Sequence, residues 1–166
     1  TCPYPNPEER AALERGLALA RETRADLLLG TDPDCDRMGA AVPDGGDYRL
    51  LTGNEMGVLL LDYIITARRR KGTLPENAAA ISTIVTSKMV RRICDVNDIH
   101  FDETFTGFKF MAEKLAEYQR DGSYQYVLAF EESYGYMMGD YVRDKDAVTA
   151  CVMITEMAAY YFEQGM

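Results

Sequence analysis

The sequence predicts an α/β fold: a mixed, largely parallel sheet sandwiched by helices, together with the tail of a preceding similar domain. Three observations favour it. Apolar residues make up 47% of the 166 residues, which is enough for a buried core. From residue 78 onward, short strand-like runs alternate with amphipathic segments of crossover length. The part before residue 53 carries one helix and a few short strands, too little for a domain of its own.

The N-terminal elements begin with a helix that follows Pro7, a residue suited to a first helical turn. The run 26–32 is short and apolar, which indicates a buried parallel strand, and 38–42 reads as a second strand followed by a turn over 43–47. A buried parallel strand needs neighbours and helices on both faces. We therefore interpret residues 1–52 as the end of a larger domain and 53–166 as the next domain.

The second part opens with a helix from Asn54 to about Arg70, whose last turn is basic and precedes Gly72, as is typical of a helix C-terminus. Strands and helices then alternate. The expected strands cover 78–87, 99–106 and 124–133, and the expected helices cover 87–98, 107–122 and 147–162.

The composition of the chain argues against several classes of function. A net charge of −9 argues against a nucleic-acid partner and against an anionic membrane surface. No apolar run is long enough to span a bilayer, and the N-terminus has no signal-peptide pattern. Four scattered cysteines are typical of reduced thiols, which predicts a cytoplasmic location. A single histidine, His100, excludes a histidine-rich metal site.

The most unusual stretch is GTDPDCDRMG, residues 30–39, in which three aspartates alternate before an arginine. Asp32, Asp34 and Asp36 repel one another unless a cation lies among them or water solvates them. An EF-hand calcium loop is excluded, because Arg37 and Pro43 stand where that loop needs glycine and glutamate. Three carboxylates suit Mg²⁺, and Arg37 suits a phosphate, but a solvated acidic turn stays open.

This loop and two further motifs together carry a family resemblance. TFTGFKF spans 104–110 and FEESYG spans 130–135, and DYVRDKDAV follows at 140–148. In this order and spacing, the motifs resemble those of the α-D-phosphohexomutases, the phosphoglucomutase and phosphomannomutase family. The resemblance implies that 1–52 is the C-terminal part of that family's second domain, with the metal loop. It implies that 53–166 is the third domain, with the sugar-binding loop.

The resemblance also implies roles for individual residues. Arg37 would neighbour the phosphate site, and Lys109 would lie near the transferred phosphoryl group, where it balances charge or assists proton transfer. Glu131 and Ser133 would bind the sugar's 3- and 4-hydroxyls. The Mg²⁺ ligands would be Asp32, Asp34 and Asp36. Judged without the resemblance, the Glu-Glu-Ser stretch could equally be an acidic cap on a turn, and Lys109 a surface lysine.

As the resemblance implies, such enzymes interconvert hexose 1-phosphate and hexose 6-phosphate through a bisphosphorylated sugar, with Mg²⁺ and a primer such as glucose 1,6-bisphosphate. The family's phosphoserine loop and its C-terminal phosphate loop do not occur in these 166 residues. The isolated chain is therefore expected to be inactive, and its partners are the remaining domains of a parent chain and a hexose phosphate. The pair Tyr134-Gly135 after the serine favours glucose as the sugar of the substrate, while mannose and a pentose stay open. The alternative is a non-catalytic sugar-phosphate or metal-binding module.

Overall fold

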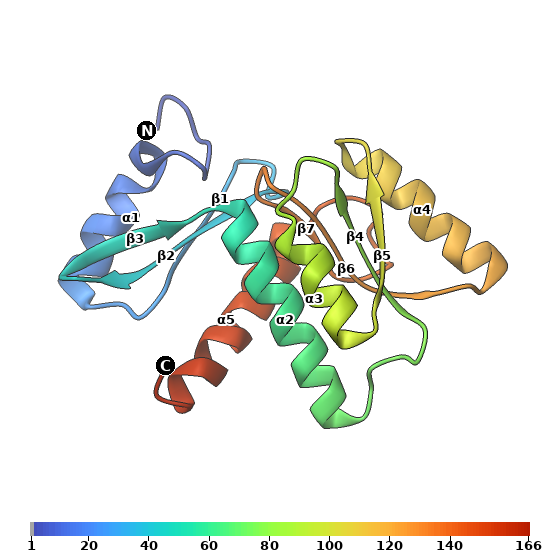
Figure 1. Cartoon of the computed structure of the whole chain (residues 1–166). Coiled ribbons are helices and arrows are strands. Elements are labelled where there is room, and N and C mark those ends of the chain that lie inside the picture. The colour runs from blue at the N-terminus through green and yellow to red at the C-terminus, as the bar shows by residue number, and fades with distance from the viewer. Residues whose placement is uncertain (1) are drawn as a thin grey trace.

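The computed structural model describes residues 2–166, which form two sheets and five helices (Figure 1). In chain order, the elements are α1 (Arg10–Thr23), β1 (Leu28–Thr31), β2 (Met38–Asp44), β3 (Asp47–Leu51), α2 (Gly53–Lys71), β4 (Ala78–Thr83), α3 (Met89–Asn97), β5 (His100–Thr104), α4 (Phe108–Asp121), β6 (Gln125–Glu131), β7 (Gly135–Met137) and α5 (Ala147–Glu163).

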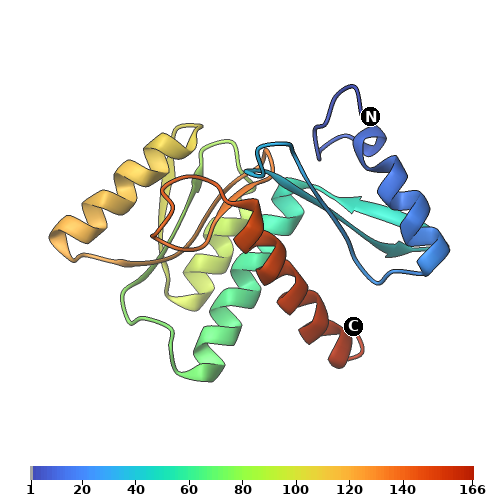
Figure 2. The ribbon, with the colours of Figure 1, turned by 180° about the vertical axis from the view of Figure 1, so that it is seen from behind.

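The larger sheet has the order β5-β4-β6-β7. β4 pairs in parallel with both β5 and β6, and β7 pairs antiparallel with β6. Helix α4 covers one face, while α2 and α3 cover the other, with α5 beside α2 near β7 (Figures 1 and 2). The predicted mixed, largely parallel sheet between helices is confirmed. The three-residue strand β7 was not predicted, because it is too short to show a pattern.

The N-terminal sheet corrects one expectation. The strand expected as buried and parallel over 26–32 is β1, which pairs antiparallel with β2 and is only half-buried. The physical reason is the short 32–37 connection, since a parallel pair needs a crossover of a dozen residues or more. Strand β3 completes this three-stranded antiparallel sheet, and α1 packs on one face through Leu13 and Leu17.

Two cores flank the larger sheet because successive strand residues point to opposite faces. Along β4, Ala78 and Ala80 face α2, α3 and α5, whereas Ala79 and Ile81 face α4. Helix α2 begins at a capping box in which Thr52 and Glu55 bond each other's backbone N–H groups. None of the helices within residues 2–166 has both the length and the apolar character needed to cross a membrane.

Candidate active site

The aspartate loop brings its three carboxylates together: oxygens of Asp32, Asp34 and Asp36 lie within 4.8 Å of one another. Asp32 is buried, and its carboxylate accepts hydrogen bonds from the backbone N–H groups of Asp36 at 3.1 Å and Arg37 at 3.0 Å. The Arg37 Nε donates to its other oxygen at 2.9 Å. Burial raises the pKa of Asp32, but these hydrogen bonds outweigh it and leave that pKa below its usual value.

A lysine that sequence reasoning missed lies beside this loop. The Lys145 Nζ is 2.9 Å from the Asp36 Oδ2, and it also lies 5.5 Å from the centre of the Phe108 ring. Burial, with the neighbouring Asp32 carboxylate, raises the pKa of Asp36, while Lys145 opposes that rise. The only signal in the sequence was its place in the RDKD run just before α5.

The aspartate loop is joined directly to the loop that follows β6. Arg37 forms an isolated antiparallel bridge with Gly135, and the Met38 N–H donates to the Tyr134 carbonyl at 3.1 Å. The Cys35 carbonyl accepts from the N–H of Ala147, the first residue of α5, at 3.1 Å. Figures 1 and 2 show the two loops side by side where the two sheets meet. Two segments about a hundred residues apart thus form one surface at the carboxyl end of β6.

Glu131 ends β6 and is buried at this junction. Burial raises the pKa of its carboxyl group, and the neighbouring Ser133 hydroxyl and Lys145 ammonium partly oppose the rise. A Cβ placed on Gly135 would lie 2.7 Å from the stem of Lys145, 2.7 Å from the Phe108 ring and 3.0 Å from the Glu131 Oε1. A side chain at 135 would therefore force Lys145 and Phe108 to move, and Glu131, Lys145 and Phe108 converge on this glycine.

The second glutamate of this loop has a different environment. The Glu132 Oε2 accepts hydrogen bonds from the Thr83 hydroxyl at 2.9 Å and from Thr86 at 3.4 Å. The Glu132 carbonyl lies only 2.0 Å from where a Cβ on Gly53 would sit, so the first turn of α2 touches the loop backbone. These contacts fix the loop from two sides, and sequence reasoning assigned Glu132 and Gly53 no role.

Lys109 is less closely connected to the aspartate loop. It is exposed in the first turn of α4, with its Nζ 5.4 Å from the centre of the Phe110 ring. Among the residues described, its ammonium makes no ion pair. Its neighbour in sequence, Phe108, packs against Lys145 at the junction. The structure therefore brings together the three aspartates, Arg37, Glu131 and Ser133, and leaves the ammonium of Lys109 out of contact with them.

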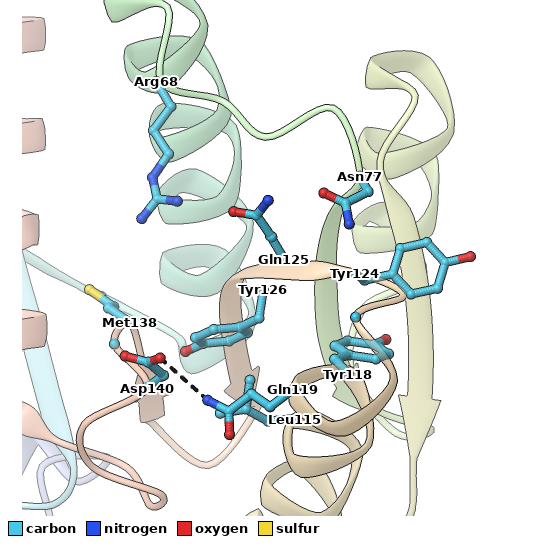
Figure 3. A pocket seen from close by; sticks show the side chains of 12 residues that line it. Arg68, Asn77, Leu115, Tyr118, Gln119, Tyr124, Gln125, Tyr126, Met138 and Asp140 are labelled. Carbon is cyan, nitrogen blue, oxygen red and sulfur yellow. Dashed lines mark hydrogen bonds between the residues drawn. The ribbon is translucent and has the colours of Figure 1, made fainter.

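A cavity of about 500 Å³ lies away from these loops (Figure 3). Its lining includes Gln125, the first residue of β6, and Asn77, just before β4, so it opens at the amino ends of the strands. Two of its tyrosine hydroxyls are already engaged: Tyr118 donates to Asp102 at 2.5 Å, and Tyr126 donates to the Met137 carbonyl. None of the predicted functional residues lines this cavity.

Comparison with known families identifies the family to which the chain belongs. The sequence model described as "Phosphoglucomutase/phosphomannomutase, alpha/beta/alpha domain III" matches residues 52–165, and the corresponding model for domain II matches residues 1–46. The chain belongs to the phosphoglucomutase/phosphomannomutase family. The predicted family is confirmed, and its third-domain match covers the sugar-loop candidates while its second-domain match covers the aspartate loop.

The curated relatives of this chain are several times longer than the chain itself. Human phosphopentomutase is 39% identical over 165 residues, covering 96% of this chain and 27% of that protein. Phosphoglucomutase of Staphylococcus aureus (strain NCTC 8325 / PS 47) is 37% identical over 155 residues, covering 93% of this chain and 27% of that protein. The chain thus spans about a quarter of the length of these curated relatives.

A solved structure supports the fold. A putative phosphomannomutase from Thermus thermophilus aligns with a TM-score of 0.72 at 23% sequence identity. The alignment covers 92% of this chain and 31% of that protein. At this identity, the likeness establishes the shared fold of the family's domains, including the mixed sheet between helices.

The donor set in this family member fits a small hard cation. All three aspartates offer carboxylate oxygens, the ligand type that Mg²⁺ prefers, and those oxygens already converge. Two of the three carboxylates are balanced by protein cations, Asp32 by Arg37 and Asp36 by Lys145. Asp34 is exposed and makes no ion pair among residues 2–166, so its charge remains available to a metal ion.

Proposed function

We propose that the chain is the metal-loop and sugar-loop portion of a phosphohexomutase that interconverts sugar 1-phosphates and sugar 6-phosphates. In this proposal, residues 1–52 are the C-terminal part of the enzyme's domain 2, and 53–166 form domain 3. The reaction passes through a bisphosphorylated sugar and starts from a bisphosphate primer. Turnover needs the serine that carries the phosphoryl group, which lies outside these 166 residues. We therefore infer that the chain alone is inactive.

The aspartate loop would supply the positive charge that phosphoryl transfer requires. Mg²⁺ bound by Asp32, Asp34 and Asp36 would act as a Lewis acid on a phosphoryl oxygen. Arg37 would keep Asp32 in place through its Nε, at 2.9 Å. Its Nη2 donates no hydrogen bond within residues 2–166, so it is available to a phosphate oxygen. Lys109 would reach the transferred group from the rim and balance its charge.

The loop after β6 would hold the sugar. Glu131 and Ser133 lie side by side next to the aspartate loop, and a carboxylate and a hydroxyl can bind vicinal sugar hydroxyls. Lys145 would hold Asp36 and border the same surface. We propose glucose phosphate as the first substrate to test. The curated relatives named phosphopentomutase and phosphoglucomutase are of nearly equal identity, so a pentose phosphate belongs in the same assay.

A single observation carries this proposal: Arg37 and Gly135 are bridged, so the candidate metal loop and the candidate sugar loop share one surface. A solvated acidic turn and an unrelated acidic cap would have no reason to pair with each other. All four cysteines are free thiols, which supports a reducing compartment such as the cytoplasm.

The test is an isomerase assay on the intact, serine-phosphorylated parent protein with Mg²⁺ and a bisphosphate primer. Glucose, mannose and ribose 1-phosphates are offered separately to wild type and to Glu131→Ala. Glu113→Ala, an exposed glutamate of α4, is the matched control. We expect turnover of at least one sugar phosphate, lost in Glu131→Ala and kept in Glu113→Ala. A folded protein with no turnover of any of the three would instead favour a binding module. The isolated 166-residue chain should show no turnover.

A further inference from the structure

We infer that the outer side of α5 is an interface with parts of the parent protein that lie outside these 166 residues. The inference rests on family membership and on packing, not on the proposed reaction. Helix α5 carries only two charged residues over its whole length, Glu156 and Glu163. A helix that is apolar nearly all round is typical of one covered on every side.

One side of α5 already has partners. Ala147, Ala150, Ile154 and Met157 are buried in the core that α5 shares with α2 and the larger sheet. Glu156 also belongs to this side of the molecule, since it accepts a hydrogen bond from the Tyr63 hydroxyl of α2 at 2.7 Å. The contacts of α5 with the rest of the chain therefore use its inner and α2-facing sides.

The opposite side is apolar and open. Val148 is 59% exposed, Val152 64% and Phe162 68%, although all three belong to the same helix. Together with Thr155 and Ala159, which are also exposed, they stand at helical spacing on one side of α5 and form what we call the outer stripe. The outer stripe runs for about 20 Å along the helix axis. Figure 2 shows α5 in front of the other elements, with none of them in front of it.

The outer stripe has no charge and no unsatisfied polar group. The Thr155 hydroxyl donates to the Cys151 carbonyl at 2.8 Å, within the helix. Because of this hydrogen bond, the Thr155 hydroxyl does not need a water molecule as its acceptor. Large apolar side chains that recur on one exposed side of a helix favour a face that is covered in the intact protein, although the exposed Glu156 and Glu163 flank this one.

The rest of the parent chain is the occupant that the comparisons favour. The match takes in 96% of this chain but only 27% of human phosphopentomutase, and the Staphylococcus aureus relative gives a similar proportion. Nearly three quarters of each of these relatives therefore lies outside the matched region, and in a parent protein of similar length that part is available to cover the outer stripe. An outer stripe of valines and phenylalanine fits an apolar intramolecular interface, which stays covered at every protein concentration.

The experiment uses the intact parent protein with one cysteine introduced at a time, Val152→Cys or Val96→Cys. Val96, on α3, is 62% exposed and stands among the charged residues Arg92 and Asp95, so it is a matched site that should stay in water. Maleimide labelling of each site is followed by mass spectrometry with fragment ions that separate the introduced cysteine from the native Cys151 or Cys94 of the same peptide, and the denatured protein is the reference for full reactivity.

We expect the cysteine at 152 to label at least about tenfold more slowly than the one at 96, at every protein concentration. Equal labelling rates in the folded protein would overturn the inference. Protection that disappears on dilution would also overturn it, because the stripe would then be covered by a second copy. If Val152→Cys fails to fold, Val148→Cys is measured in the same way. None of these readings depends on catalysis, so an inactive parent protein would leave the result interpretable.

Discussion

The ζ-amine of Lys145 lies 2.9 Å from a carboxylate oxygen of Asp36, at the point where the loop before α5 meets the aspartate loop. Both side chains are largely withdrawn from water, with 21% and 29% of their surface exposed. The pair balances the charge of one of three crowded carboxylates. It also links the two halves of the chain at the candidate active site.

Replacing Lys145 with methionine keeps the packing stem and removes the charge. We expect the free energy of unfolding without metal to fall by about 1–2 kcal/mol, since half-buried Asp36 keeps only the more distant Arg37 Nε, at 3.9 Å, as a cationic partner. We also expect Mg²⁺ to bind more tightly, because one competing cation has been removed from the carboxylates. Isothermal titration with Mg²⁺ on the intact protein measures the second effect. Weaker Mg²⁺ binding in Lys145→Met would show that the lysine supports the metal ion and does not compete with it.

Gly53→Ala tests whether α2 fixes the loop after β6. Alanine ordinarily stabilises a helix relative to glycine by up to about 1 kcal/mol. Here the new Cβ would lie 2.0 Å from the Glu132 carbonyl, so the loop backbone has to move. We expect destabilisation by about 2 kcal/mol together with a higher KM for the sugar phosphate.

Gly16→Ala in α1 is the matched control for Gly53→Ala. Its Cβ would meet only the end of the flexible Leu28 side chain, at 3.1 Å. It should therefore leave KM unchanged and alter stability little. Denaturant unfolding and initial-rate kinetics on the intact protein measure both variants, and equal behaviour of the two would contradict a positioning role for Gly53.

Glu131→Gln should stabilise the fold at neutral pH while lowering kcat/KM. The pKa of Glu131 is raised by burial, so the folded protein binds its proton more tightly than the unfolded chain does. The stability that Glu131 contributes is therefore fully present below its unfolded pKa and is lost as pH rises through the higher folded value. Glutamine stays neutral throughout, so the stabilising effect should be present at pH 7 and disappear below about pH 4. Thermal unfolding at both pH values measures it, and destabilisation at pH 7 would contradict a raised pKa.

The larger sheet was predictable because its strands and helices are long, strongly patterned and alternate regularly. The prediction that 26–32 forms a parallel strand was wrong for a physical reason that differs from this. An apolar run of four or five residues looks the same in a parallel and an antiparallel strand, and only the length of the following connection separates the two. The 32–37 connection is far too short for a crossover, a fact that the sequence contained.

Some residues of the candidate site were likewise predictable from the sequence, and others were not. Asp32, Asp34 and Asp36 stand out because their spacing is local, and the motif resemblance brought in Glu131 and Ser133. Lys145, Glu132 and Gly53 act through contacts between segments far apart in the chain. Their positions depend on how the loops pack, which no local pattern records. Lys109 remains a prediction from the resemblance, since its ammonium contacts none of the grouped residues.

We propose that the three aspartates hold a Mg²⁺ that serves catalysis, and a substitution of Asp34 separates this role from a purely structural one. Its carboxylate makes no ion pair or hydrogen bond among residues 2–166, so Asp34→Asn should leave the melting temperature unchanged. The measurement is kcat for glucose 1-phosphate against Mg²⁺ concentration, on wild-type and Asp34→Asn parent protein. We predict Mg²⁺-dependent turnover that falls at least about 100-fold in the variant, since a catalytic metal supplies several kcal/mol of charge stabilisation. A folded Asp34→Asn protein with wild-type kcat at the same Mg²⁺ concentration would show that Asp34 holds no catalytic metal ion.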